Sequence, residues 1–142
     1  MTLDDGEAVR HLMEDDPLTG RMQMTTKFQV DPVKAWNALK PDMAGAVAVD
    51  GERVLGTATV AFEDIRYNGR VLPSAYLENL KVHHAARGRG IGTALAEWRV
   101  EQARARFGKE GVIVTGTSTD NIASQNTMKK WANQFFSPLT LT

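Results

Sequence analysis

The 142-residue sequence has no cysteine, which excludes a disulfide scaffold, thiolate zinc sites and a cysteine nucleophile. It has no excess charge of either sign, because 17 lysines and arginines balance 17 aspartates and glutamates. No overall field therefore favours nucleic acid or a membrane surface as a partner. It has no apolar run near the ~20 residues that cross a membrane and no basic leader. We expect one cytoplasmic domain over residues 1–142.

Two helices are expected in the first third of the chain. Apolar residues recur at helical spacing after Asp5, and the pattern ends at residues 15–17, Asp-Asp-Pro. Asp31 followed by Pro32 predicts the cap and first turn of a second helix. Its buried stripe should contain Val33, Trp36 and Leu39.

The middle of the chain has the pattern of three strands, at residues 44–49, 54–62 and 71–83. They are separated by Asp50-Gly51 and Asn68-Gly69, dipeptides typical of tight hairpin turns. We therefore expect an antiparallel meander.

The last third alternates between helix and strand. The expected elements are a helix over 91–107 ended by Gly108, a buried strand over 111–115, a helix over 120–135 and a short strand over 138–141. Together with the meander they predict an α/β (α+β) domain, in which helices flank a mixed, mostly antiparallel sheet.

One strand-to-helix junction concentrates glycine and positive charge. Residues 87–92 read Arg-Gly-Arg-Gly-Ile-Gly, Lys81, His83 and His84 come just before them, and no acid occurs from residue 81 to 96. Glycines let the backbone approach a ligand closely, and the N-terminus of a helix attracts phosphate groups. A purely structural turn is the alternative, but three glycines in five residues cost much conformational entropy for that. The junction predicts an anion site.

Two common nucleotide sites fit this junction poorly. A P-loop requires a lysine after the glycines, and none is present. A dinucleotide fingerprint requires a third glycine where Thr93 stands. A nucleotide-binding module is therefore disfavoured.

The pattern Arg/Gln-x-x-Gly-x-Gly/Ala is satisfied by Arg87, Gly90 and Gly92, and it resembles the acetyl-CoA motif of the GNAT superfamily of N-acetyltransferases. Residues 121–130 are similar to that family's Asn-x-x-Ala-x-x-Leu-Tyr-x-Lys helix. The resemblance covers roughly residues 43–136. It implies a GNAT-like sheet, with acetyl-CoA as cosubstrate and no metal. The implied reaction is acetyl transfer to a primary amine by direct attack in a ternary complex.

The resemblance also implies which residues bind acetyl-CoA. The pyrophosphate would contact the junction, the pantetheine arm would run along the third strand, and the predicted helix over 120–135 would line the same channel. The implied residues are Arg87, Gly88, Arg89, Gly90, Ile91, Gly92 and Thr93 for the pyrophosphate, and Leu80, Lys81, Val82, Asn121 and Ser124 for pantetheine.

Glu78 is the candidate general base, since several family members carry an acid at this position. It lies four residues before Val82, and strict alternation would place both on one strand face. Tyr76 is a second candidate, as a base or a substrate contact. The alternative for Glu78 is a structural carboxylate paired with Lys81 or Arg70.

Other polar residues have simpler explanations. His83 and His84 are adjacent, so alternation should point them to opposite faces, away from any shared metal. The long helix carries cations that we expect on a solvated face: Arg99, Arg104, Arg106 and Lys109.

The sequence departs from the family pattern at Met128, at Ala132-Asn133 in place of Gly-Phe, and at both ends. Met128 stands where the family often has a tyrosine general acid, which favours a non-catalytic acyl-CoA-binding or regulatory domain as the alternative function. The family's first strand and final hairpin have no counterpart. We therefore expect a partial domain, whose sheet a homodimer partner or a further domain completes. The acceptor stays open among small amines, antibiotics, amino acids and protein amino groups.

Overall fold

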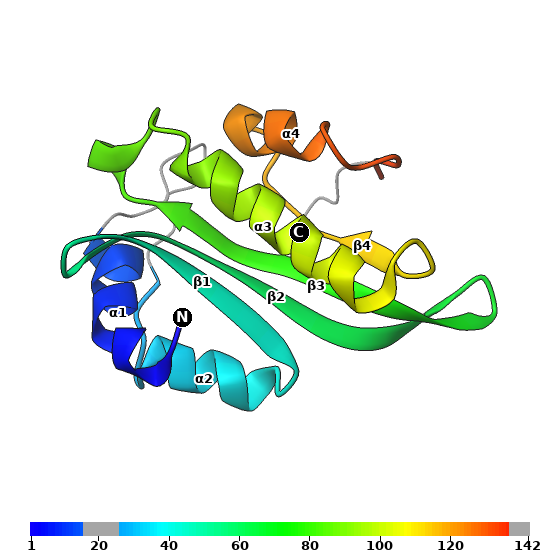
Figure 1. The fold of residues 1–142 in the computed structure, drawn as a ribbon, viewed down its shortest axis with the longest axis horizontal. Helices are drawn as coiled ribbons and strands as arrows, with labels where there is room; N and C mark the ends of the chain where they lie inside the picture. The colour runs from blue at the N-terminus through cyan, green and yellow to red at the C-terminus, as the bar shows by residue number, and fades with distance from the viewer. Residues whose placement is uncertain (16–25, 137–142) are drawn as a thin grey trace, which may run out of the picture.

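The computed structural model describes residues 1–15 and 26–136. One sheet with strand order β1-β2-β3-β4 separates helices α1 and α2 from helix α3 (Figure 1). The elements are η1 (Leu3–Asp5), α1 (Gly6–Asp15), α2 (Pro32–Leu39), β1 (Met43–Asp50), β2 (Arg53–Tyr67), β3 (Arg70–Val82), η2 (His84–Ala86), α3 (Ile91–Phe107), β4 (Val112–Val114) and α4 (Ile122–Met128). Within these residues, no helix combines the length and apolar character needed to cross a membrane.

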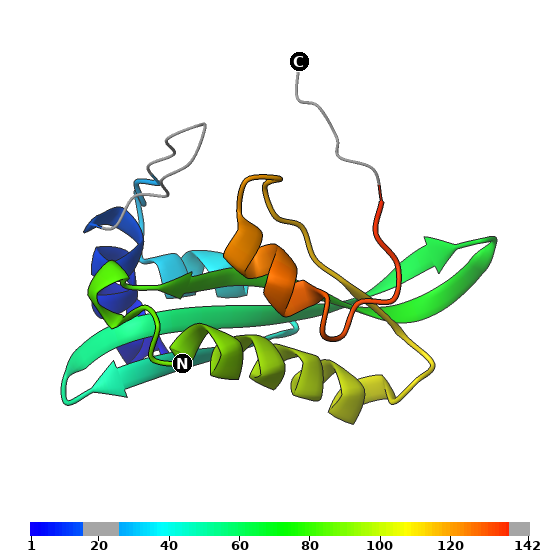
Figure 2. The same ribbon diagram turned by 90° about the horizontal axis from the view of Figure 1, so that it is seen from above.

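The predicted meander is confirmed. β1 pairs with β2 and β2 with β3, both antiparallel. Asn68 and Gly69 have φ of 48° and 75°, the left-handed values that a tight hairpin turn requires and that these residue types tolerate. β2 runs to Tyr67, five residues further than predicted, and β3 begins one residue earlier than predicted, so their hairpin extends beyond the rest of the sheet (Figures 1 and 2).

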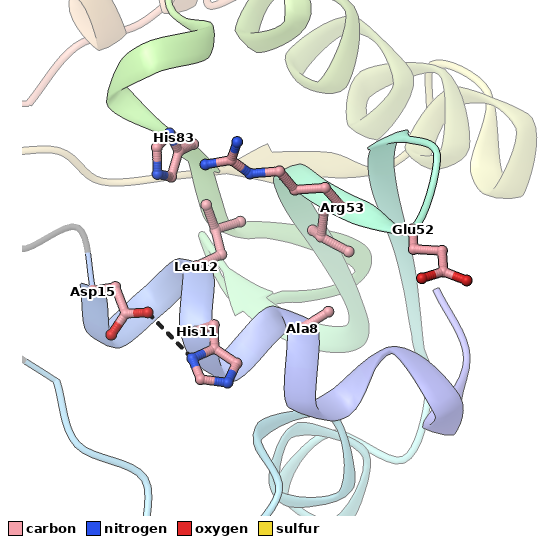
Figure 3. A pocket seen from close by; sticks show the side chains of 8 residues that line it. Ala8, His11, Leu12, Asp15, Glu52, Arg53 and His83 are labelled. Carbon is pink, nitrogen blue, oxygen red and sulfur yellow. Dashed lines mark hydrogen bonds and ion pairs between the residues drawn. The ribbon is translucent and has the colours of Figure 1, made fainter.

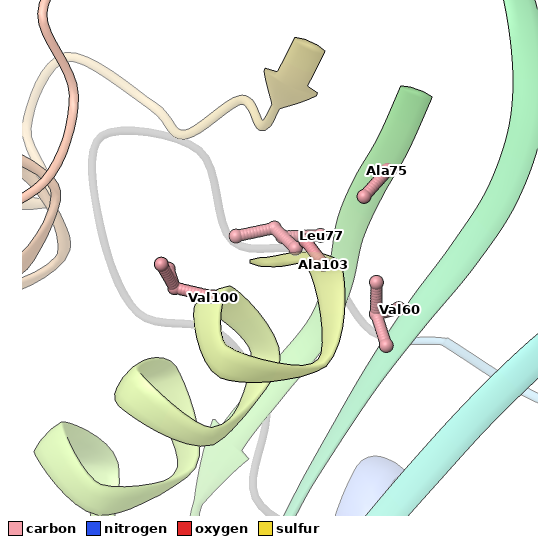
Figure 4. Close-up of a cluster of buried hydrophobic side chains, with 5 residues drawn as sticks. All are labelled: Val60, Ala75, Leu77, Val100 and Ala103. Carbon is pink, nitrogen blue, oxygen red and sulfur yellow. The ribbon is translucent and has the colours of Figure 1, made fainter. Parts of the chain in front are cut away.

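The main core lies between the sheet and α3. β2 contributes Val60, β3 contributes Ala75 and Leu77, and α3 contributes Val100 and Ala103 (Figure 4). All five are at most 5% exposed. Full burial of a valine or leucine side chain contributes roughly 1.5–3 kcal/mol, so this contact fixes α3 against β3.

The opposite face of the sheet is covered by the first two helices. Val9 and Leu12 of α1 and Val33 of α2 are at most 3% exposed. Asp31 caps α2 as predicted, accepting the Lys34 N–H at 2.9 Å. The prediction for Leu39 is wrong, because it is 76% exposed. Six residues at 3.6 per turn place it about 120° away from Val33 around the helix.

Two predictions for the C-terminal third are wrong. β4 is shorter than expected and only half-buried, because β3 is its one sheet neighbour among the described residues. α4 ends at Met128 rather than continuing to residue 135. The next residues form turns, in which the N–H groups of Trp131 and Ala132 both donate to the Met128 carbonyl. The predicted strand over 138–141 lies outside the described residues.

The expectation of a partial domain stays a prediction. The described residues before α1 form the short η1 turn rather than a strand. The sheet is mixed because β3 and β4 are parallel, and it is otherwise antiparallel, as the sequence predicted.

Candidate functional site

The site begins at a bulge in β3. Glu78 pairs with Thr59 and Lys81 pairs with Thr57, so two residues of β3 lie opposite one residue of β2. Asn79, inside the bulge, has a left-handed φ of 50°, which asparagine tolerates better than most residues. Its Nδ2 donates to Thr59 Oγ1 at 3.0 Å, and this bond anchors the bulge to a buried side chain.

The bulge corrects the prediction that Glu78 and Val82 share a face. Paired residues of antiparallel strands share a face, so Glu78 and Lys81 face the α1–α2 layer with their partners in β2. Val82 instead faces α3, where a Cβ added to Gly92 would lie 3.5 Å from Val82 Cγ2. The extra residue reverses the alternation between the two positions. Tyr76, which precedes the bulge, does share the face of Glu78.

A cleft opens where β3 and β4 part. The two strands pair only from Ser74 to Tyr76 on the β3 side, and Thr115 Oγ1 then donates to the Leu77 carbonyl at 2.8 Å. Beyond this bond lies a cavity of about 330 Å³. Residues 77–81 of β3, residues 115–117 after β4, Arg99 of α3 and Ser124 of α4 line it.

The cleft contains only some of the residues that the resemblance implied. Glu78, Leu80, Lys81 and Ser124 line it. Tyr76 does not line it and is 36% exposed. Its ring lies 5.9 Å from Lys40 Nζ, a cation–π contact. These placements bring the candidate base to the cleft and leave the second candidate beside it.

Asn121 has a structural role that is independent of any ligand. It is the N-cap of α4, and its Oδ1 accepts the Ser124 N–H at 3.0 Å. This bond holds Ser124 at the cleft, whereas Asn121 itself does not line it. A ligand role for Asn121 therefore stays a prediction.

The glycine-rich junction follows the C-terminal end of β3, beyond the residues of β3 that line the cleft. Gly88 and Gly90 have left-handed φ of 77° and 81°, and Gly90 is the N-cap of α3. The residues at 87–90 are exposed. The first N–H groups of a helix have no partner within it, so residues 91–93 present donors at an open, positively charged corner. This geometry suits an anion such as pyrophosphate.

The two adjacent histidines are not on opposite faces. Their rings stack with centroids 4.3 Å apart, because His83 follows the last residue of β3 and caps η2. Strand alternation therefore does not apply to them. Across residues 1–15 and 26–136, no cluster of three or more potential metal-ligating side chains is present.

The sequence prediction for Arg99 is wrong. Its residue is 5% exposed, and its Nη1 donates to the Glu78 carbonyl at 3.2 Å. Burial lowers the pKa of the guanidinium to about 10, so it stays protonated at neutral pH. Leu95, Arg99 and Ala103 recur every four residues and are all buried. The helical spacing therefore predicts a buried position for Arg99, although the residue type by itself favours solvent.

A second cavity, of about 260 Å³, lies between α1 and the start of β2 (Figure 3). His11, Arg53 and His83 are among its lining residues. His11 Nδ1 lies 3.1 Å from Asp15 Oδ2 on the same helix. None of the acetyl-CoA or catalytic candidates lines this cavity.

A family model described as the acetyltransferase (GNAT) family matches residues 7–132. The chain belongs to the GNAT acetyltransferase family. A search of curated proteins gave no match. The resemblance stated from the sequence is thus confirmed, and the bulged β3, the cleft and the glycine junction lie within the matched residues.

Solved structures share the GNAT fold of this chain over its whole length. A crystal structure described as a transcriptional regulator from Bacillus halodurans C-125 is 25% identical, with a TM-score of 0.76 over 100% of this chain and 95% of that chain. A predicted acetyltransferase from Clostridium acetobutylicum, determined with acetyl-CoA, is 18% identical, with a TM-score of 0.68 over 100% and 92%. The aminoglycoside 6'-N-acetyltransferase AAC(6')-IG from Acinetobacter haemolyticus is 13% identical, with a TM-score of 0.66 over 100% and 93%.

Proposed function

We propose that this GNAT domain transfers the acetyl group of acetyl-CoA to a primary amine by direct attack in a ternary complex. The observation that supports this most is the continuity of β3. Its bulged segment lines the cleft at Glu78, and four residues later the strand ends just before the glycine-rich junction. One strand thus connects a place for the thioester with a place for the pyrophosphate.

The cofactor proposal uses the free edge of β3. Within the described residues, β3 has β2 as its only strand partner after Tyr76. Pantetheine can therefore lie along residues 80–82 like an added strand, through main-chain hydrogen bonds. The pyrophosphate would contact the junction from residue 87 to 93, with Ser124 facing the arm.

The chemistry proposed for the cleft needs a base on the amine side. Glu78 faces the α1–α2 layer and lines the cleft, so its carboxylate would take the ammonium proton directly or through water. An N–H of the bulged segment would polarise the thioester carbonyl. Tyr76 shares this face and is proposed as a substrate contact or second base.

Met128 favours a second candidate function. It ends α4 where the family often has a tyrosine, and a thioether has no proton to donate. A non-catalytic acyl-CoA-binding or regulatory domain is therefore the alternative. In the catalytic proposal the leaving thiolate takes its proton from water.

The proposal is tested with Glu78→Gln and, as a matched control, Glu97→Gln on the exposed side of α3. Acetyl-CoA and CoA, but not ATP, should stabilise the wild type and both variants against heat, by about 2.7 kcal/mol at a ligand concentration roughly 100 times the dissociation constant. Turnover is followed as CoA release with a panel of primary amines.

We expect Glu78→Gln to lose roughly 10²–10⁴-fold in turnover while it still binds acetyl-CoA, and Glu97→Gln to keep both. Binding without turnover in the wild type would support the regulatory alternative. Stabilisation by neither acetyl-CoA nor CoA would end the proposal, and full activity of Glu78→Gln would place the base elsewhere.

A further inference from the structure

Arg99 brings a buried positive charge to the cleft from the α3 side. Its residue is 5% exposed, and it lines the cavity with Glu78 and Lys81, the other charged residues there. Nη1 donates to the Glu78 main-chain oxygen, while the buried Nε finds no acceptor among the described residues.

This arrangement is costly unless the charge acts on a ligand. Removing an ion from water is unfavourable even after the protein relaxes, and Arg99 shares its stripe of α3 with Leu95 and Ala103. One hydrogen bond to a neutral carbonyl offsets little of that cost. An electron-rich atom in the cleft would offset more, because the surroundings screen the charge weakly.

The reaction proposed for this cleft produces such an atom. The amine nitrogen forms a bond to the thioester carbonyl carbon, the carbon–sulfur bond breaks, and its electron pair leaves on sulfur. The nitrogen, which begins as an ammonium, loses two protons in all. In the net reaction one proton is transferred through water to the CoA sulfur, and the other is released to solvent.

We propose that Arg99 stabilises the departing CoA thiolate as a fixed positive charge and hydrogen-bond donor. The inference rests on the proposed function. Arg99 supplies no proton, so it does not take the general-acid role of the tyrosine that is absent at position 128. A general acid is less necessary when the thiolate is stabilised, because the thiolate can then leave before it is protonated.

The other charged residues of the cleft face the opposite layer. Glu78 and Lys81 pair with Thr59 and Thr57 on the α1–α2 face of the sheet, whereas Arg99 comes from α3. The remaining lining side chains are Met, Leu, Asn, Thr and Ser, which do not titrate near neutral pH. A negative Glu78 would oppose thiolate formation, so among the charged side chains of the cleft only Arg99 and Lys81 can stabilise it.

The test measures the acid dissociation of CoA bound to the protein. The ultraviolet absorbance of the thiolate is followed against pH for the wild type, for Arg99→Met, and for Arg104→Met, which removes an exposed charge from the same helix. The wild type and Arg104→Met should lower the pKa of the bound thiol by about 1–3 units relative to free CoA. Arg99→Met should abolish this shift and lower kcat at least tenfold, with KM for acetyl-CoA little changed.

Affinity for desulfo-CoA, the analogue without the sulfur, should be the same in all three proteins. If Arg99→Met does not fold, Arg99→Lys and Arg99→Gln replace it: the charged variant should keep the shift and the neutral one should lose it. An equal thiol pKa with and without the Arg99 charge would overturn the inference while leaving acetyl transfer intact. So would a shift that survives in Arg99→Met and disappears in Lys81→Met. Failure of CoA to bind the wild type would instead remove the proposed function.

Discussion

Replacing Gly90 or Gly92 with alanine makes the same chemical change two residues apart, and we expect opposite effects on stability. Gly90 has a φ of 81° at the N-cap of α3. A left-handed conformation costs a residue with a Cβ about 1–2 kcal/mol. Since no atom lies within 4 Å of the added Cβ, this backbone term should be the whole effect.

Gly92 lies inside α3 with an ordinary helical backbone. Its added Cβ would meet Val82 Cγ2 at 3.5 Å, a normal van der Waals contact. Alanine in place of glycine within a helix stabilises by up to about 1 kcal/mol, and near the first turn we expect roughly half of that. The same geometry explains why the motif accepts glycine or alanine at this position.

The two variants should therefore differ by about 2 kcal/mol in free energy of unfolding, which is roughly 6–8 °C in Tm for a domain of this size. Urea unfolding and calorimetry of the two variants and the wild type measure the difference. Equal destabilisation by both would show that crowding rather than the sign of φ controls the junction, and would refute the reasoning.

Three further predictions concern the core, a helix cap and pH. Leu77→Ala should cost about 3 kcal/mol in urea unfolding, because Leu77 is 2% exposed in the main core; a loss below about 1 kcal/mol would contradict that packing. Asp31→Ala should cost about 1 kcal/mol through loss of the cap on Lys34 N–H, and Asp31→Asn should restore most of it. Burial lowers the Arg99 pKa to about 10, well below the ordinary value of an arginine, so above about pH 9 the unfolded chain binds more protons than the folded chain. The unfolding free energy of wild type relative to Arg99→Met should thus rise from about pH 9 to pH 11; a flat difference would contradict the shift.

The elements that the sequence predicted well are those bounded by residues with special backbone requirements. α3 was predicted to the residue because Gly90 and Gly108 bracket it, and both have positive φ. The two hairpins were predicted for the same reason. In each case a local residue type requires one conformation, and no distant contact is needed to choose it.

The bulge could not be predicted, because it depends on a partner strand. Period-two alternation assumes one residue opposite one residue, and the extra residue at Asn79 appears only when β2 is paired with β3. Asparagine permits a left-handed φ but does not require it. The face assigned to Val82 relative to Glu78 failed for this reason, although Glu78 itself lies at the cleft.

The predicted C-terminal end of α4 was wrong for another reason, because the apolar spacing in the sequence continues past the end of the helix. Phe135 and Phe136 extend the pattern but are 57% and 79% exposed. Arg99 is the opposite case: a charged residue type was assigned to solvent although its spacing placed it on the buried stripe. Spacing predicts a buried face only where something packs on that face, and this is a tertiary property.

The parting of β3 from β4 gives two adjacent segments of β3 different numbers of strand partners. From Ser74 to Tyr76 it has a partner on each side, whereas from Leu77 onward β2 is its only strand partner among the described residues. Amide protons on the open side should exchange with solvent by small local openings, and those in the doubly paired part only by larger ones. Pantetheine lying along the open side would slow exchange there and leave the earlier residues unchanged. Residues 77–82 would then report occupancy of the cleft, with residues 74–76 of the same strand as the internal reference.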